Sequence, residues 1–521
     1  MAQVRNVLFI MCDQLRADHL SCYGHPHLHT PNLDLLASRG VRFDRAYAQS
    51  GVCGPSRMSY YTGRYMTSHG ATWNRVPLSA GELTLGDYLR AGGLTAALAG
   101  KTHVMPDVDG LTRFGVEAGS ELGRLMRNGG FVEIDRYDGH SPPGSESGYP
   151  AYLRSHGYTS GDPWSDFVIS ALDAEGKVVS GWNMRNARLP ARVKEEHAET
   201  AYMTDQAIGF IRDQGAKPWV LHLSYVKPHW PYMAPAPYNA MYAPADCLRP
   251  NRSREELENQ HPVLAAYRQH EESKNFARDE VIDTVKPTYM GLIKQIDDHL
   301  GRLWQALDQS GRWNDTLVAF TSDHGEFTGD HWLGEKEMFY EEALRVPLIV
   351  YDPDAAADST RGKIEARFAE CVDVLPTLLE ALAVPGAPHL IEGCSLLPLT
   401  RGATPGNWRD CVFSELDYSF RHARRILGRH PRDCRAWMVR SDDWKYVHWL
   451  GLRPQLYDMW ADPNELDDLG ADPRLAQVRA GLHQCLFEWM SRLKLRTTIS
   501  DAEVELRTNA HRKHGIHFGV W

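Results

Sequence analysis

The sequence has no apolar run long enough to cross a lipid bilayer, which needs about 20 consecutive apolar residues. The apolar stretch nearest the N-terminus, residues 7–11, is far too short for a membrane helix or for the apolar core of a secretory signal. A positively charged segment before it and a small-residue cleavage site after it are also missing. We therefore expect no membrane partner and a cytoplasmic location.

The sequence also lacks an excess of positive charge. Its 57 basic and 67 acidic residues give a formal net charge of −10. Nucleic acids and anionic membranes bind extended basic surfaces, so this balance argues against both as bulk partners. An anionic substrate would need a local cluster of positive side chains.

Cysteines are few and carry no pairing pattern. The nine cysteines are scattered along the chain and include no C-x-x-C pair. An odd, dispersed set is typical of reduced thiols, and it excludes neither catalysis nor modification at a single cysteine. A disulfide framework and a thiolate zinc site are both disfavoured.

Strand-like and helix-like segments alternate from residue 4 to about residue 390. Apolar runs typical of buried parallel strands occur at residues 4–11, 95–100, 219–225, 316–320 and 346–351. This alternation predicts an α/β fold in which a large mixed, mainly parallel β-sheet is sandwiched by helices. One helix is expected at residues 287–309, with Pro287 at its start.

Other segments depart from this pattern. Residues 106–195 predict a loop-rich insertion around a pocket, and the charged residues 248–284 predict an exposed excursion. From about residue 405, short strand-like runs and a helix predict a small antiparallel sheet. We expect a large α/β domain over residues 1–400, a C-terminal subdomain over 401–496, and a tail over 497–521. The tail is expected to pack on the body or on a neighbouring subunit.

Polar side chains follow several of the predicted strands. They are Asp13 and Gln14, Lys101 and His103, His229, and Asp323 and His324. Taken singly, such residues are more often turn or solvated residues than functional ones. Because ligands bind at the carboxyl ends of strands in open α/β sheets, their repetition predicts a site. The carboxylates, amide and imidazole of the first and last pairs suit one divalent cation.

The chain is organised around Cys53-Gly54-Pro55-Ser56-Arg57, at the start of a predicted helix. Pro55 suits the first helical turn, and Arg57 beside a helix N-terminus makes an anion site. Cys53 is open to several interpretations: a low-pKa nucleophile, a metal ligand, a redox group or a residue destined for modification. It can also be a buried structural cysteine, the usual fate of an isolated one.

The surroundings of this stretch resemble the sulfatase family within the alkaline-phosphatase-like superfamily. The matching blocks follow the family's order: residues 6–14 (NVLFIMCDQ), 30–43, 100–103 (GKTH), 227–229 (KPH), 321–326 (TSDHGE) and 334–336 (GEK). The resemblance runs from about residue 4 to about residue 470 and implies the α/β fold predicted above. It also implies that Cys53 is oxidised to formylglycine, with a formylglycine-generating enzyme as the maturation partner.

The resemblance implies a metal site built from residues that lie far apart in the sequence. Asp13, Gln14, Asp323 and His324 would bind one divalent metal ion together with the modified Cys53. Many sulfatases carry a carboxylate where Gln14 stands and an amide where His324 stands. The metal is therefore either Mn²⁺ or Ca²⁺, and an imidazole ligand leans toward Mn²⁺.

The resemblance also implies roles for the remaining polar residues. Arg57, Lys101 and Lys336 would stabilise negative charge on the non-bridging oxygens. His103 would act as base in the breakdown step, and His229 would bind the ester and protonate the leaving oxygen with Lys336. One hydroxyl of the hydrated formylglycine would attack sulfur or phosphorus in line.

Two reactions remain open for this site. The pair Lys101 and His103 is that of sulfatases, whereas Asn74, a predicted substrate-binding residue, lies in a block more similar to phosphonate monoester hydrolases. We expect a hydrolase of sulfate monoesters that also cleaves phosphonate monoesters and phosphodiesters. The alternative is that a phosphonate monoester or phosphodiester is the main substrate. A non-catalytic binder of sulfated ligands is disfavoured because nucleophile, cations and ligands are all present.

The leaving group and the assembly are less constrained by the sequence. Trp73, Trp230, Tyr232 and Trp332 lie beside predicted site residues and form either an apolar wall for an aryl group or part of the core. The unpatterned tail and the resemblance favour a homodimer or homotetramer.

Overall fold

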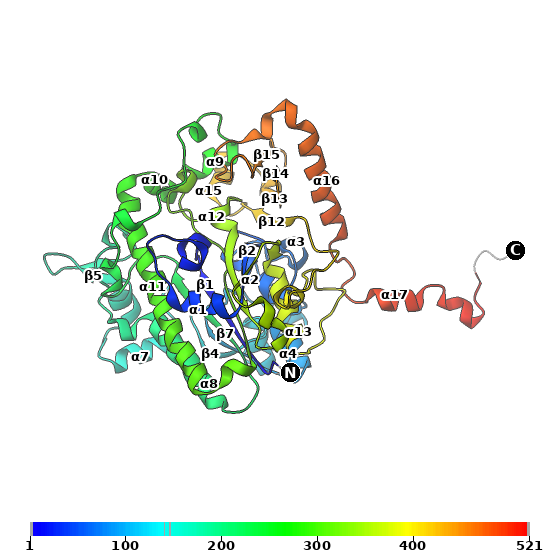
Figure 1. The fold of residues 1–521 in the computed structure, drawn as a ribbon, viewed down its shortest axis with the longest axis horizontal. Helices are drawn as coiled ribbons and strands as arrows, with labels where there is room; N and C mark the ends of the chain where they lie inside the picture. The colour runs from blue at the N-terminus through cyan, green and yellow to red at the C-terminus, as the bar shows by residue number, and fades with distance from the viewer. Residues whose placement is uncertain (1–3, 140, 145–146, 518–521) are drawn as a thin grey trace.

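The computed structural model describes residues 4–139, 141–144 and 147–517, and its centre is a mixed β-sheet covered by helices on both faces (Figure 1). The strands of this sheet are β1 (Asn6–Asp13), β2 (Val41–Tyr47), β3 (Ala96–Gly100), β4 (Val132–Arg136), β7 (Val220–Pro228), β8 (Thr316–Ser322), β9 (Arg345–Tyr351), β10 (Lys363–Glu365) and β11 (Ala369–Glu370). Their order is β10-β2-β9-β8-β1-β7-β3-β4, with β11 also paired to β2. Pairing is parallel except for β9, which is antiparallel to β2 and β8. The predicted fold class is confirmed.

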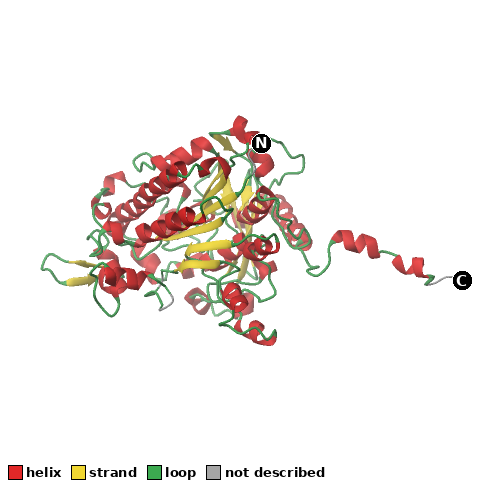
Figure 2. Cartoon of the chain, turned by 90° about the horizontal axis from the view of Figure 1, so that it is seen from below, coloured by secondary structure: helices red, strands yellow, loops and turns green. Residues whose placement is uncertain are grey.

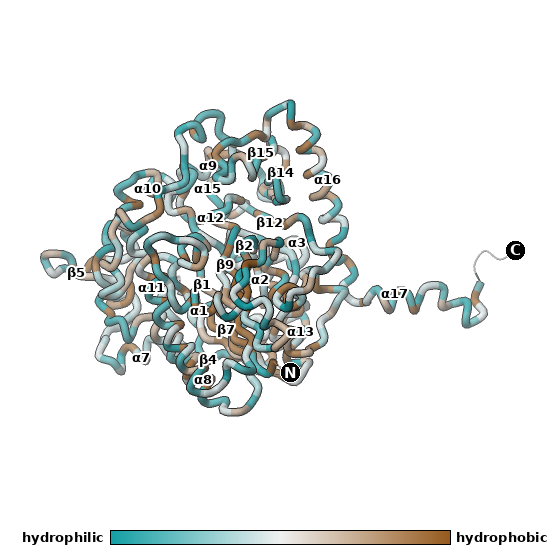
Figure 3. The backbone as a smooth tube through the Cα atoms, in the orientation of Figure 1, coloured by the Kyte–Doolittle hydropathy of each residue, from teal (hydrophilic) through white to brown (hydrophobic). Residues whose placement is uncertain are grey.

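The two faces of β1 pack against different helices. Leu8 and Ile10 join a cluster with α1 (Pro31–Arg39), α8 (Glu199–Gln214) and α11 (Asp279–Gln309). Val7 and Phe9 join a second cluster with α2 (Cys53–Thr62), α4 (Leu85–Ala91) and α13 (Val374–Ala381). Figure 3 shows the apolar residues concentrated along the central strands and α2. Burial on both faces explains why such strands are continuous apolar runs in the sequence.

Shorter elements connect these layers. They are α3 (Met66–His69), α5 (Val108–Arg113), α6 (Glu121–Arg127), α7 (Tyr149–Ser155), α9 (Pro262–Tyr267), α10 (Glu271–Phe276), α12 (Glu341–Leu344), α14 (Leu397–Thr400) and α15 (His422–Ile426), with the hairpin β5 (Ser170–Leu172) and β6 (Val178–Ser180). Within the segment predicted as a loop-rich insertion, β4 pairs with β3 and extends the central sheet. That segment is therefore more than loops, because its strand completes one edge of the sheet.

A second, antiparallel sheet follows in the last quarter of the chain. Its strands are β12 (Val412–Asp417), β13 (Arg435–Arg440), β14 (Trp444–Trp449) and β15 (Gln455–Asp458), in that order. One face packs on α16 (Ala476–Arg492) through Val439, Tyr446 and Leu486. The other face packs on the larger domain. The four strands and the helix lie where the sequence predicts them.

Two predictions about residues 248–309 are wrong. Helix α11 begins at Asp279, so Pro287 lies inside the helix rather than at its start. The segment before it is not wholly exposed, because Val263 and Leu264 of α9 are buried. Buried apolar side chains decide the structure in both places. In α11, the free energy gained by burying Val281 and Val285 exceeds the cost of the backbone hydrogen bond lost at Pro287.

Over residues 497–517, the part that the structure describes, the C-terminal tail does not pack on the body of its own chain (Figure 1). It carries the short helix α17 (Asp501–Arg507), which extends away from the rest of the molecule (Figures 1 and 2). Contact with a neighbouring subunit stays a prediction. Among the helices that the structure describes, none combines the length and apolar character needed to traverse a bilayer.

Candidate active site

Four neighbouring parallel strands carry polar residues to one edge of the central sheet. In the order β8, β1, β7, β3, these residues are Asp323, Asp13, His229 and Lys101, each at or just after the end of its strand. Because the strands run in the same direction, their carboxyl ends lie side by side. The fold therefore gathers residues that are up to about 300 positions apart in the sequence.

Cys53 is the first residue of α2 and is fully buried at this edge. Its Sγ lies 3.1 Å from His324 Nε2 and 3.8 Å from Asp13 Oδ1. One turn later, Arg57 donates to Asp323 Oδ2 from Nε (2.7 Å) and to Asp13 Oδ2 from Nη2 (3.1 Å). Arg57 thus fixes the start of α2 against both carboxylates.

Four potential metal ligands surround one point. Ligand atoms of Asp13, Cys53, Asp323 and His324 all lie within 4.8 Å of one another, and all four residues are buried. His324 Nδ1 donates to the Gly325 carbonyl (2.8 Å), which leaves the lone pair on Nε2 free to bind a cation. Burial lowers the pKa of His324, so the imidazole is neutral, as a metal ligand must be. These residues fit a divalent cation.

Gln14, the remaining predicted metal ligand, is held in one orientation by hydrogen bonds. Its backbone φ is 68°, and its backbone N–H donates to Asp323 Oδ1 (3.1 Å). The side-chain Nε2 donates to the Glu326 carboxylate, while Oε1 accepts from Lys336 Nζ (2.8 Å). Glu326 also accepts from the Tyr232 hydroxyl (2.9 Å). Sequence reasoning missed the roles of Glu326 and Tyr232, although Glu326 ends the TSDHGE block.

Cationic side chains line the other side of Cys53. Lys101 forms a fully buried ion pair with Asp13. Lys336 Nζ donates to His229 Nε2 (3.0 Å), because His229 Nδ1 donates to the Trp230 carbonyl (2.7 Å) and leaves Nε2 as the acceptor. Burial opposes charge on Lys336, but the carboxylates of Glu335 and Asp13 outweigh it and raise the Lys336 pKa above its usual value. Lys336 is therefore an ammonium beside a neutral imidazole.

The electrostatic surroundings of Cys53 argue against one of its interpretations, the low-pKa nucleophile. Burial and the Asp13 carboxylate raise the pKa of its thiol to about 12, although Lys336 and Lys101 act in the opposite direction. Burial also opposes ionisation of Asp13, but the positive charges of Lys101 and Arg57 hold the Asp13 pKa well below its usual range. The thiol is protonated beside an ionised carboxylate, which disfavours a thiolate nucleophile.

Two further predicted residues lie at the border of the cluster. His103 has a positive φ of 56°, its backbone N–H donates to Asp138 Oδ1 (3.2 Å), and desolvation and Lys101 lower its pKa well below the usual value. Asn74 Oδ1 accepts from the Gly54 N–H (2.7 Å), beside Cys53. Their roles as base and substrate ligand stay predictions. The structure places Asn74 against the residue that follows Cys53, and His103 near Lys101 and Asp138.

Comparison with known protein families identifies the chain. A family model described as Sulfatase matches residues 5–115 and 116–384. The chain belongs to the sulfatase family. A second model, described as N-sulphoglucosamine sulphohydrolase, C-terminal, matches residues 329–492, which include the antiparallel sheet and α16.

The similar proteins include members of two groups, arylsulfatases and phosphonate monoester hydrolases. The multifunctional alkaline phosphatase superfamily protein PehA of Trinickia caryophylli is 34% identical over 93% of this chain and 95% of its own. An arylsulfatase of Clostridium perfringens is 29% identical over 89% of this chain and 90% of its own. The crystal structure of the phosphonate monoester hydrolase of Agrobacterium radiobacter has a TM-score of 0.82 at 31% identity, covering 94% of this chain and 97% of that one. This sulfatase-family member is therefore a hydrolase related to both groups, and the family implies a bound metal ion.

Proposed function

We propose that this sulfatase-family hydrolase cleaves sulfate monoesters through a formylglycine made from Cys53, and cleaves phosphonate monoesters and phosphodiesters less efficiently. One observation carries the proposal: Arg57, Lys101 and Lys336 converge with the metal-ligand cluster on the buried Cys53 side chain. Buried positive groups stabilise the non-bridging oxygens of a transferring sulfuryl or phosphoryl group. Lys101, one of the two residues on which the preference for sulfate rests, lies inside this cluster.

A divalent ion, Mn²⁺ or Ca²⁺, held by Asp13, Gln14, Asp323 and His324 would supply Lewis-acid activation of the nucleophile and the ester. The chain's own groups then have separate tasks. The Lys336 ammonium, hydrogen-bonded to His229, holds a proton for the leaving oxygen. His103 has a lowered pKa and is neutral, so it can accept a proton when the covalent ester breaks down.

Phosphonate monoester or phosphodiester hydrolysis as the main activity is the second candidate. The observation that favours it is the similarity to PehA and to the Agrobacterium radiobacter phosphonate monoester hydrolase over nearly the whole chain. Both candidates use the same nucleophile and metal, so they differ in the substrate rather than in the machinery.

A direct comparison of rates tests the proposal. The purified enzyme, with its bound metal identified, is assayed on an aryl sulfate, an aryl phosphonate monoester and an aryl phosphodiester with the same leaving group. We expect kcat/KM for the sulfate to equal or exceed that for the phosphonate. A preference of roughly a hundredfold for the phosphonate, about 2.7 kcal/mol in transition-state stabilisation, would establish the second candidate instead.

Mass spectrometry of the peptide that contains Cys53 tests the nucleophile. We expect the mass of the aldehyde rather than that of the thiol, and complete loss of turnover in Cys53→Ala. An unmodified cysteine in fully active enzyme would contradict the formylglycine.

The partners and location follow as part of the same proposal. A formylglycine-generating enzyme would mature the chain, the substrate would be a small ester rather than nucleic acid or membrane, and the enzyme would act in the cytoplasm as a homodimer or homotetramer. The net charge of −10 and the concentration of cations at one buried point support the small anionic substrate.

A further inference from the structure

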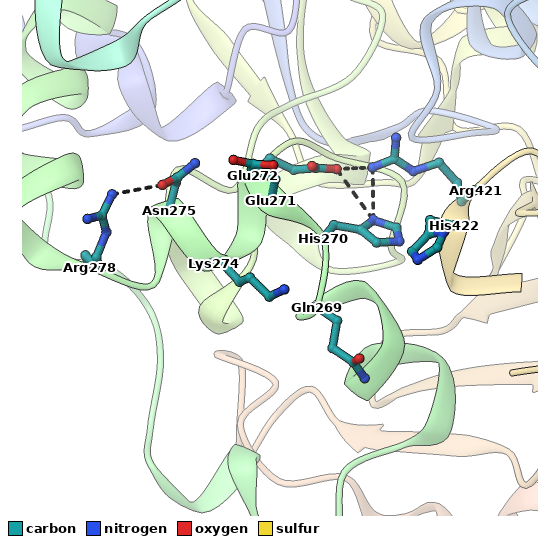
Figure 4. A pocket seen from close by; sticks show the side chains of 9 residues that line it. All are labelled: Gln269, His270, Glu271, Glu272, Lys274, Asn275, Arg278, Arg421 and His422. Atoms are coloured by element: carbon teal, nitrogen blue, oxygen red, sulfur yellow. Dashed lines mark hydrogen bonds and ion pairs between the residues drawn. The ribbon is translucent and has the colours of Figure 1, made fainter. Parts of the chain in front are cut away.

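Helix α10 separates two surface cavities that adjoin along its outer face. One, with a volume of about 680 Å³, is lined by charged and amide side chains that include Arg421 and His422 (Figure 4). The other, about 760 Å³, is lined by Trp182 and Arg185 among others. Glu271, Asn275 and Arg278 line both cavities, so the two meet at α10.

The first cavity approaches the active site through a residue next to Lys336. Arg421, in the first cavity, forms an ion pair with Glu337 (3.0 Å), the residue that follows Lys336. Figure 4 shows Arg421 pointing toward Glu272 of α10 and His270. Gly334 lies so close to Phe276 and to the Glu272 carbonyl that a Cβ there would clash. Helix α10 therefore lies directly against the segment that carries Lys336.

A row of indole rings leads from the active site into the second cavity. The Trp230 ring lies 4.3 Å from the His229 ring, and Lys336 Nζ lies 5.9 Å from the centre of the Trp230 ring. The Trp182 ring lies 5.6 Å from the Trp230 ring. Trp182 is 48% exposed and borders the cavity, which is unusual for so large an apolar side chain.

The other aromatic residues near the site have different surroundings. Tyr232 is buried and hydrogen-bonded to Glu326, and Trp332 lies under Arg252 and donates to the Ser253 carbonyl. The Trp73 ring stacks on the ring of Phe420, the residue before Arg421, with 5.7 Å between the ring centres. Tyr232 and Trp332 thus have contacts typical of residues that support the fold. Trp230 lies where an apolar wall for an aryl group is expected, and Trp182 extends this wall.

We propose that Trp182 and Trp230 form the binding site for the leaving group and that this leaving group is a planar aromatic alcohol. The inference rests on the proposed function, because it places the reacting ester at Cys53 with its leaving oxygen toward His229 and Lys336. An aromatic ring leaving in that direction meets the indole faces, where offset or tilted ring contacts are favourable. Asn275, Arg278 and Arg185 at the outer end provide polar groups for a hydrogen-bonding ring substituent.

Substitution of Trp182 tests this site because each variant can be compared with the wild type on the same ester. We expect Trp182→Ala to lower kcat/KM for an aryl ester about tenfold, the size of a lost aromatic contact. For an alkyl ester of the same acid the change is expected to stay within about twofold, and Trp182→Phe should recover most of the aryl activity. Trp460→Ala removes an 84% exposed indole elsewhere on the surface and is the matched control. It should leave kcat/KM unchanged for both esters.

Equal losses on the two esters, or unchanged aryl activity, would overturn the proposal. A binding measurement separates its failure from that of the proposed function. Calorimetry with 4-nitrophenol in the Cys53→Ala background needs no turnover, and we expect binding that Trp182→Ala weakens about tenfold while Trp460→Ala leaves it unchanged. If no ester is hydrolysed but 4-nitrophenol binding depends on Trp182 and not on Trp460, the aromatic site is supported and the proposed hydrolysis is wrong. If 4-nitrophenol binding does not depend on Trp182, the aromatic site is wrong whatever the reaction.

Discussion

Gln14 illustrates how neighbouring side chains can fix the orientation of a predicted metal ligand. Its amide cannot rotate freely, because Glu326 accepts from Nε2 and Lys336 donates to Oε1. A carboxylate in this place would need no such orientation, since both of its oxygens are acceptors. The predicted role of Gln14 as a metal ligand therefore depends on the residues that orient its amide.

Removal of the Glu326 carboxylate should weaken metal binding. We expect Glu326→Ala to lower the affinity for Mn²⁺ about 10–100-fold. Tyr232→Phe should lower it less, because the phenol contacts Gln14 Nε2 only at 3.4 Å and acts mainly through Glu326. Calorimetric titration of chelator-treated protein measures the affinity, and the thermal unfolding midpoint serves as the control. Unchanged Mn²⁺ affinity in Glu326→Ala would show that Gln14 is not a metal ligand or needs no orientation.

Loss of the His103 imidazole should affect breakdown rather than formation of the covalent ester. We expect kcat to fall about 10²–10⁴-fold in His103→Ala, with accumulation of an enzyme-bound sulfate ester that mass spectrometry detects. The physical reason is that the neutral His103 imidazole is the proposed proton acceptor. An unchanged kcat would remove His103 from the mechanism.

The segment between β8 and β9 holds its shape through a buried charge network. His331 has a positive φ of 52° and lies between two carboxylates, with Nδ1 2.7 Å from Glu256 and Nε2 3.4 Å from Glu342. Its ring stacks on Tyr340 at 3.7 Å. This network ties the segment that carries Glu326 and Lys336 to residues 251–268, and so connects two elements that the sequence does not relate.

The network should make stability depend on pH in a definite direction. Burial disfavours the charged ring, but Glu342 and Glu256 outweigh it and raise the pKa of His331 to about 10. A raised folded-state pKa means that the stabilisation is complete below about pH 6.5 and is lost as the pH rises through about 10. We expect His331→Gln to lower the free energy of unfolding by about 3 kcal/mol at pH 7 and by clearly less at pH 10.

Urea unfolding of wild type and His331→Gln at both pH values measures this difference. Tyr340→Leu, which removes the stacked ring but neither carboxylate, is the matched control and should show a deficit that does not change with pH. A deficit of His331→Gln that grows from pH 7 to pH 10 would contradict the assignment of a protonated His331.

At the scale of the whole molecule, the C-terminal tail stands out because contacts within its own chain do not account for the stability of its helix. Helix α17 has seven residues, too short to be stable alone in water. Its Leu506 is 70% exposed, as is Leu495 at 86% just before it. An isolated short helix with exposed leucines is expected to bury them on another copy of the chain, which is the predicted neighbouring-subunit contact.

Truncation of residues 497–521 should therefore change the assembly and spare the catalytic unit. We expect light scattering to give a dimer or tetramer for the full chain and a smaller species for the truncated chain. Because α17 extends away from the body, kcat per chain and the unfolding midpoint should change little (Figure 2). A full-length monomer, or an unchanged mass after truncation, would contradict a role of the tail in assembly.

Strands buried on both faces, such as β1 and β8, were predictable because their apolar runs are continuous and end in polar residues. The start of α11 was not, because Pro287 is a strong local signal that burial of Val281 and Val285 overrides. Glu326 and Trp182 also escaped prediction. Their importance comes from contacts with Gln14 and Trp230, residues distant in the sequence, and no local pattern records such contacts.

The sequence by itself determined the family, the α/β class and the identity of the polar residues that end each strand, because these depend on local periodicity and on short motifs. Tertiary structure decided which of those residues meet. Four parallel strands in the order β8, β1, β7, β3 place Asp323, Asp13, His229 and Lys101 side by side, and α2 presents Cys53 to them. The protonated state of the Cys53 thiol and the neutral state of His324 follow from burial and neighbouring charge, which exist only in the folded chain.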